Sequence, residues 1–408
     1  MVQEFQIGGA PAGLLPYFTC GGFPRDRRNW TESAPTHTFG RGSDSWQGIG
    51  RMEDSLKYKC PKHLSYDLPM KVADILRGLA ETAGDAVIGG LDRDGFADQL
   101  AEKVRSLLGC EAALFMASGK TAQNILLKLW CERRGFRSIA VHPRSHIEQW
   151  EGKGYAHVFG LNAVAFGDYD RQTVPTDIDS LPAQLGVASI ELALRPLGCP
   201  VIPWDDLVSI SQRLRSRGVP FHGDCARLWE AQPHLDRPWP DIARLFDSLY
   251  VSVYKGLGGL AGAVVLGPAD LIAEARIWQV RLGQRLPVEF PFALAGLKGL
   301  EERLSLQGAF HSKARSLAAT IAQVDDVRVT PSPPHTNAFQ VILAGRREKM
   351  DAARDEVARR KGIWLYELAP HNPIEGLVTF EVHIRTAGLM VQEAEVRDAV
   401  ALFQSLVQ

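Results

Sequence analysis

Short apolar segments alternate with amphipathic ones between about residue 70 and residue 300. Phe96, Leu100 and Val104 recur at helical spacing, and the amphipathic segments 121–135 and 205–218 each end near a glycine, so all three predict helices. Short, mostly apolar segments between them predict buried strands at 111–118, 138–142, 187–192, 219–224, 248–253 and 260–267. Strands that alternate with helices predict an α/β fold, with a mostly parallel central sheet and helices on both faces.

The pattern changes near residue 300. A long helical stretch over 291–323 leads to a proline-rich break at 331–337. Predicted strands and helices then alternate over the segments 338–343, 346–361, 363–367, 378–385 and 391–407. This predicts a smaller C-terminal α+β domain, in addition to a large α/β domain.

Residues 1–60 show no helical periodicity and are rich in Gly, Pro, Arg and Trp. We expect an extension with little regular structure, in which Trp30 and Trp46 pack against the main body or a partner subunit, because exposed tryptophans are costly in water. The expected organisation is an N-terminal extension over 1–60, a large domain over 61–300 and a small domain over 301–408.

Charge and cysteine content narrow the function classes. Lys and Arg number 46 and Asp and Glu number 47, so no basic excess supports binding to nucleic acid or to an anionic membrane surface. The six cysteines are far apart and form no CxxC pair, which disfavours a metal site and a disulfide framework. The N-terminus lacks a basic signal region, and no apolar run is long enough to cross a membrane, so we expect a cytoplasmic protein.

Polar segments follow several of the predicted strands, at the edge where parallel sheets bind ligands. The first is SGKTAQN, in which Ser118, Gly119, Lys120 and Thr121 begin a helix whose free amides suit a phosphate. An ordinary capped turn is the alternative. The second contains His146, which could stack on a ring or move a proton, and Glu151, its potential partner or base. A structural histidine and an exposed carboxylate are the alternatives there.

Two further segments carry complementary chemistry. In HGDCAR, Asp224 could hold a protonated ring nitrogen and Arg227 a substrate carboxylate, although an internal ion pair has the same pattern. In SVYKGLGGLAG, Lys255 could become the neutral amine that a Schiff base requires, although a surface lysine fits as well. An aspartate for the ring nitrogen and a lysine for the aldehyde are the protein groups that pyridoxal 5'-phosphate needs, so their order predicts this cofactor.

From about residue 64 to 390 the chain resembles the threonine aldolase and β-eliminating lyase family of fold-type I pyridoxal-phosphate enzymes. The family's SGTxAN, HxDGAR and SKGLG motifs match SGKTAQN, HGDCAR and YKGLG. The resemblance implies cofactor binding by Ser118, Gly119, Lys120, Thr121, His146, Asp224, Arg227 and Lys255. It also implies that Glu151 lies near the ring, that Arg227 and Arg385 hold the substrate carboxylate, and that the protein is a homodimer or homotetramer.

Departures from the family motifs fall around the substrate side chain. Ile88 stands where the family has a tyrosine. The segment ELALR replaces the family's ENTHN, so Leu194 is expected in place of a histidine. Cys225 and Tyr254 also differ from the residues that are usual in the family motifs. We therefore expect a lyase of amino acid metabolism that cleaves the Cα–Cβ bond of a β-hydroxy-α-amino acid, with Lys255, His146 and Glu151 as catalytic residues. A β-eliminating lyase or transaldolase-like transferase on a related amino acid, and a non-catalytic protein of the same fold, are the alternatives.

Overall fold

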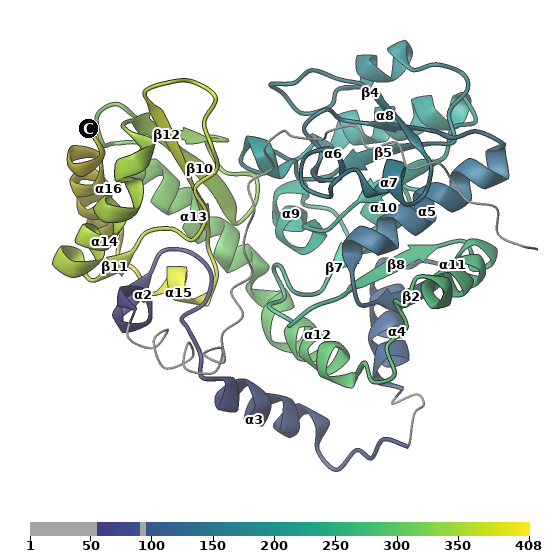
Figure 1. Cartoon of the computed structure of the whole chain (residues 1–408), viewed down its shortest axis with the longest axis horizontal. Coiled ribbons are helices and arrows are strands. Elements are labelled where there is room, and N and C mark those ends of the chain that lie inside the picture. The colour runs from purple at the N-terminus through teal and green to yellow at the C-terminus, as the bar shows by residue number, and fades with distance from the viewer. Residues whose placement is uncertain (1–54, 90–94) are drawn as a thin grey trace, which may run out of the picture. The chain divides into compact units, whose positions relative to one another are not determined.

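A seven-stranded sheet forms the centre of the larger lobe of the molecule (Figure 1). The structure is a computed structural model that describes residues 55–89 and 95–408. The expected packing of Trp30 and Trp46, and nearly all of the predicted extension, lie outside the described residues. The end of that extension includes a short helix, α2 (Leu56–Lys59).

The strands of this sheet follow the order β2-β8-β7-β6-β5-β3-β4. Their bounds are β2 (Ala112–Met116), β3 (Ser138–Val141), β4 (Asn162–Ala165), β5 (Val187–Glu191), β6 (Phe221–Asp224), β7 (Ser248–Ser252) and β8 (Ala263–Gly267). All neighbours pair in parallel except β8, which is antiparallel to both β2 and β7. The six predicted strands and the mostly parallel sheet are therefore confirmed, and β4 was missed.

Helices cover both faces of the large sheet. Leu114 packs with Ile125 and Leu126 of α5 (Gly119–Arg134) in one hydrophobic cluster, together with residues of α11 (Ala269–Arg281). Its chain neighbour Phe115 points the opposite way, into the cluster that contains residues of α4 (Phe96–Leu108) and α8 (Trp204–Ser216). Successive strand residues thus bury against different helices, as expected for a sheet covered on both sides.

The small lobe is built around an antiparallel sheet of three strands, in the order β12-β10-β9. The strands are β9 (Val327–Thr330), β10 (Ala338–Ala344) and β12 (Leu377–His383), and the helices that pack against them are α13 (Gln307–Ile321), α14 (Met350–Lys361) and α16 (Glu393–Val407) (Figure 1). The chain enters this lobe early, because β1 (Lys62–His63) pairs with β11 (Ile363–Trp364) and Leu64 lies in the small core. We propose that the small domain includes residues 62–64 as well as the C-terminal region.

The predicted helical stretch over 291–323 is confirmed, although it is divided into two helices. The stretch 291–323 forms two helices, α12 (Phe290–Arg303) and α13, joined by a tight 3₁₀ turn at Leu304–Leu306. This turn contains no proline or glycine, so the local sequence gives no sign of it. Within the described ranges, no helix is both long and apolar enough to cross a membrane.

Candidate active site

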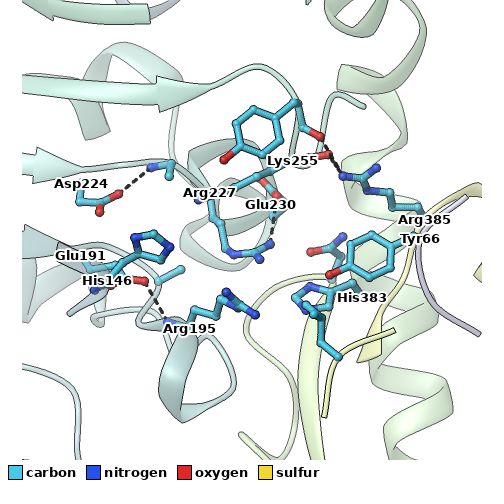
Figure 2. A pocket seen from close by; sticks show the side chains of 15 residues that line it. Tyr66, His146, Glu191, Arg195, Asp224, Arg227, Glu230, Lys255, His383 and Arg385 are labelled. Carbon is cyan, nitrogen blue, oxygen red and sulfur yellow. Dashed lines mark hydrogen bonds and ion pairs between the residues drawn. The ribbon is translucent and has the colours of Figure 1, made fainter. Parts of the chain in front are cut away.

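The carboxyl ends of β5, β6 and β7 meet at a cavity of about 210 Å³ (Figure 2). Glu191 ends β5 and Asp224 ends β6, and the two residues are Cα partners; Asp224 is also the partner of Tyr250 in β7. The cavity is lined by Tyr66, His146, Glu191, Ala193, Arg195, Asp224, Ala226, Arg227, Glu230, Tyr254, Lys255, Asn337, Leu368, His383 and Arg385. The sheet edge predicted from the sequence is thus where these side chains gather.

Lys255 and Asp224 line this cavity together. Burial lowers the pKa of Lys255, the nearby Arg227 lowers it further, and Asp224 opposes the shift. A lowered pKa increases the fraction of neutral amine, the form that attacks an aldehyde. Burial raises the pKa of Asp224, whereas Lys255 opposes this shift, and one carboxylate oxygen accepts a hydrogen bond from the Ala226 amide at 3.2 Å. The pair places an amine and a buried acid at the ends of neighbouring strands.

His146 is held in place at two points. Its amide donates to Glu191 Oε2 at 2.8 Å, and its ring nitrogen Nδ1 lies 2.9 Å from Glu151 Oε1. Glu151 also accepts hydrogen bonds from the side-chain amides of Gln123 at 2.7 Å and Asn124 at 3.3 Å. Glu151 does not line the cavity, and its side chain is 2% exposed, so it contacts the site through His146.

The predicted phosphate turn lies beside the cavity and does not line it. Ser118 immediately precedes the 16-residue helix α5, which begins at Gly119, so the first amides of a long helix are available at this point. A Cβ atom on Gly119 would lie 3.0 Å from the ring of Tyr250, the strand partner of Asp224. Lys120 Nζ donates to the carbonyl of Trp150 at 3.3 Å, in the His146 segment, and Thr121 lies in the first turn of α5.

Arg227 faces the cavity together with a carboxylate, Glu230, that was not predicted from the sequence. Glu230 lies three residues later in the chain, with Oε1 3.5 Å from Arg227 Nη1, and its side chain is 1% exposed. Its other oxygen, Oε2, is buried and has no hydrogen-bond partner in the described structure. Gly256 makes room for this carboxyl group, because a Cβ atom there would lie 2.6 Å from Glu230 Cδ.

Arg385 reaches the cavity from the small lobe. Its Nη1 donates to Asp67 Oδ2 at 3.0 Å, and its Nη2 donates to the carbonyl of Tyr254 at 3.0 Å and to the carbonyl of Lys255. Asp67 is also paired with Arg303 at 2.8 Å. The structure thus brings Arg385 to the site, where its donors engage the chain on both sides of the Lys255 backbone.

A second group of side chains completes the wall and was not predicted. Arg195 donates through Nε and Nη2 to Glu381 Oε2 at 3.2 and 3.1 Å, and His383 Nε2 lies 2.9 Å from the same oxygen. Although burial alone raises it, His383 and Arg195 bring the pKa of Glu381 down to about 2. His383 stacks on Tyr66 with ring centroids 5.0 Å apart. These residues come from three distant segments, which no local motif connects.

Only some of the residues that differ from the family motifs line the cavity, although all of them were expected near the substrate side chain. Leu194 is fully buried and does not line the cavity, whereas its neighbour Arg195 does, because successive residues after β5 point to opposite sides. Ile88 and Cys225 also do not line the cavity, while Tyr254 does. The ELALR segment therefore contributes a cation to the site where a leucine was expected.

Comparison with known proteins identifies the family. Residues 77–345 match the family model described as β-eliminating lyase. Low-specificity L-threonine aldolase 1 of Arabidopsis thaliana is 27% identical over 268 residues, which cover 60% of this chain and 72% of that protein. Low specificity L-threonine aldolase of Saccharomyces cerevisiae is 26% identical over 285 residues, which cover 67% of this chain and 71% of the relative.

Solved structures agree with this match. A Listeria monocytogenes protein, provisionally assigned as an L-allo-threonine aldolase, superposes with a TM-score of 0.80 at 27% identity, covering 87% of this chain and 99% of that one. A sphingosine-1-phosphate lyase of Burkholderia pseudomallei, 14% identical with a TM-score of 0.65, shares the fold over 92% of this chain and 93% of its own. The fold-type I architecture is confirmed, and the relatives named as threonine aldolases are pyridoxal-phosphate-dependent carbon–carbon lyases. The chain belongs to the β-eliminating lyase family, as its strand-end motifs predicted.

Proposed function

We propose that this protein is a pyridoxal-phosphate-dependent lyase that cleaves the Cα–Cβ bond of a β-hydroxy-α-amino acid. The observation that carries the proposal is the placement of Lys255 and Asp224 in one cavity, at the ends of neighbouring strands. Family membership supports the same reaction class, because several relatives are named as threonine aldolases.

The residues around the cavity fit pyridoxal 5'-phosphate. Lys255 offers an amine with a lowered pKa for the aldehyde, and Asp224 offers a buried carboxylate for the ring nitrogen. His146 is fixed beside them for ring stacking, and Ser118, Gly119, Lys120 and Thr121 offer the start of α5 for the phosphate. When bound, the cofactor accepts the electron pair that is released as a bond to Cα breaks.

The protein's own groups then have separable roles. Asp224 keeps a proton on the ring nitrogen by its negative charge, and Arg227 binds the substrate carboxylate with its planar guanidinium. Cleavage requires the β-hydroxyl to lose its proton as the Cα–Cβ bond breaks, which yields an aldehyde and, after Cα is protonated, glycine. We assign this proton transfer to His146, with Nδ1 held by Glu151 and Nε2 left to exchange the proton. The contacts around Glu151 favour an orienting role for this carboxylate, since it already accepts three hydrogen bonds.

Part of the cavity wall differs from what the family motifs predict, and this difference supports a second candidate reaction. Arg195 and His383 line the cavity, both bond Glu381 behind them, and none of the three was expected from the family motifs. A β-eliminating lyase or transaldolase-like transferase acting on a related amino acid is therefore the second candidate. We also propose a homodimer or homotetramer, which size-exclusion chromatography with light scattering tests.

One assay separates the candidate reactions. The full-length protein, loaded with pyridoxal 5'-phosphate, is incubated with a panel of β-hydroxy-α-amino acids and of amino acids that carry other β-substituents. Glycine and an aldehyde are the products expected for the proposed reaction. Ammonia and a keto acid would support β-elimination, and release of neither product pair from any substrate would overturn the assignment as a lyase.

A further inference from the structure

Two guanidinium groups compete for the role of partner to Arg227 at the substrate carboxylate. The resemblance assigns this role to Arg385, but Arg195 lines the same cavity. The question which of these two arginines binds the carboxylate rests on the proposed function, because it assumes an amino-acid substrate in this cavity. The hydrogen bonds that each guanidinium already makes within the protein distinguish the two arginines.

Arg385 is committed to the protein. One of its terminal nitrogens donates to Asp67, and the other donates to the backbone carbonyls of Tyr254 and Lys255. Asp67 is half-buried and also pairs with Arg303; although burial alone raises its pKa, Arg385 and Arg303 lower it, so it stays ionised. These contacts give Arg385 a structural task, which is to fix the backbone that carries the Lys255 amine.

Arg195 has a free edge. Its Nε and Nη2 both donate to a single oxygen of Glu381, and within the described residues no hydrogen bond from its Nη1 is seen. The side chain is 23% exposed, and its guanidinium points toward the middle of the cavity, as does that of Arg227 (Figure 2). A planar guanidinium that is held along one edge can present its remaining N–H groups to a carboxylate.

The surroundings of Arg195 hold it ready for a ligand. Glu381, with its pKa near 2, remains charged, and His383 bonds the same oxygen at 2.9 Å. The ring of Trp150 lies against the guanidinium, 5.1 Å from its central carbon. The turn that carries Arg195 is packed against the small lobe, because a Cβ atom on Gly198 would lie 2.1 Å from the carbonyl oxygen of Thr330. A fixed cation loses little conformational freedom when it binds an anion.

We propose that Arg195 and Arg227 together bind the α-carboxylate of the amino-acid substrate, and that Arg385 positions Lys255. The ELALR turn of the large lobe thereby supplies an arginine that binds the substrate carboxylate. Strand β12 of the small lobe supplies Glu381, which orients that arginine. Recognition of the carboxylate then depends on the one ion pair, between Arg195 and Glu381, that joins the two lobes at this point.

The test compares two small ligands that differ at the carboxylate. Glycine and its neutral amide, glycinamide, are titrated into the full-length protein loaded with pyridoxal 5'-phosphate, and binding is read from the absorbance of the bound cofactor. In Arg195→Gln we expect the affinity for glycine to fall by about 10- to 100-fold, the loss typical of a hydrogen bond to a charged group, with glycinamide affinity nearly unchanged. Arg385→Gln should instead weaken both ligands alike or reduce cofactor loading.

Two controls keep the result decisive. Arg144 donates to the carbonyl of Pro196 in the same turn but does not line the cavity, so Arg144→Gln should leave the ratio of the two affinities at the wild-type value. If Arg195→Gln does not fold, Arg195→Lys is the second variant. It keeps the positive charge but lacks the planar guanidinium, so it should still lower the ratio of glycine affinity to glycinamide affinity. An unchanged ratio of glycine to glycinamide affinity in the Arg195 variants would overturn the inference, and a collapsed ratio in Arg385→Gln would assign the carboxylate to Arg385 instead. Glycine binding is read without any bond cleavage, so failure of the lyase assay leaves this test intact.

Discussion

Glu191 and Asp224 stand opposite each other, in register, at the ends of two parallel strands. Burial and the nearby Asp224 raise the pKa of Glu191 to about 7, despite hydrogen bonds from the amides of Arg195 and His146. Two buried carboxylates on one sheet edge do not readily carry full charge together, so Glu191 takes up a proton near neutral pH. Burial also raises the pKa of Asp224, but Lys255 and His146 oppose that shift, so positive groups on the cavity side favour the charged form of Asp224.

The first prediction concerns Asp224. In Asp224→Ala the cofactor should still bind, but turnover should fall by about 10²- to 10³-fold, because a buried charge that stabilises the reaction is lost. Steady-state kinetics of the loaded enzyme measure the change. Glu191→Gln, on the neighbouring strand, should cost much less. Equal losses in the two variants, or none in Asp224→Ala, would argue against the ring-nitrogen role.

The pH dependence of cofactor capture tests the environment of Lys255. Its amine reacts when neutral, so the rate of capture by protein stripped of cofactor should rise with pH and level off below pH 10.5, the ordinary pKa. Arg227 contributes to the lowered pKa of Lys255, and Arg227→Gln should therefore move the midpoint to higher pH. Stopped-flow absorbance gives both profiles. A midpoint that does not move would show that Arg227 has no electrostatic effect on this amine.

Glu151 is expected to act through His146. Glu151→Gln should lower kcat by about 10- to 100-fold with little change in cofactor affinity, because the imidazole loses the carboxylate that holds Nδ1. Glu148→Gln is the matched control, since Glu148 lies in the same segment but bonds Tyr155 and Lys153 away from the cavity. A kcat in Glu151→Gln no lower than in the control would exclude the orienting role.

The turn that carries Arg195 should be sensitive to a single added methyl group. Gly198 has a φ of 86°, and an added Cβ would collide with the Thr330 carbonyl, so Gly198→Ala should lower the free energy of unfolding by about 2–4 kcal/mol. Gly160 has a φ of 65° but open space around it, and Gly160→Ala should cost only about 1 kcal/mol. Urea denaturation compares the two variants. Equal losses would mean that the contact with Thr330 contributes nothing.

The sequence was most informative where the structure is local. Buried strands appear as short, mostly apolar segments, and the motifs at the ends of β6 and β7 keep a cavity-lining residue within a few positions of the strand end, so Asp224 and Lys255 could be found. The edge strand β4 was missed because Asn162–Ala165 is only four residues long and largely exposed. The same reliance on local pattern hid the turn at Leu304–Leu306.

The missed part of the site depends on contacts between distant segments. Tyr66 pairs with Ile384 through a single bridge, and Arg195 meets Glu381 across 186 positions of sequence. Neither contact leaves a periodicity or spacing that could be recognised in advance. The choice of Leu194 over Arg195 also shows that a motif aligned by position does not reveal which of two adjacent side chains faces the cavity.

The covalent attachment of the cofactor tests the central claim most directly. The loaded full-length protein is reduced with borohydride, digested, and analysed by peptide mass spectrometry, which locates the lysine that carries the cofactor. We predict a single modified peptide, with the added mass on Lys255. Attachment to another lysine, such as Lys120 at the start of α5, or no attachment at all, would contradict the account.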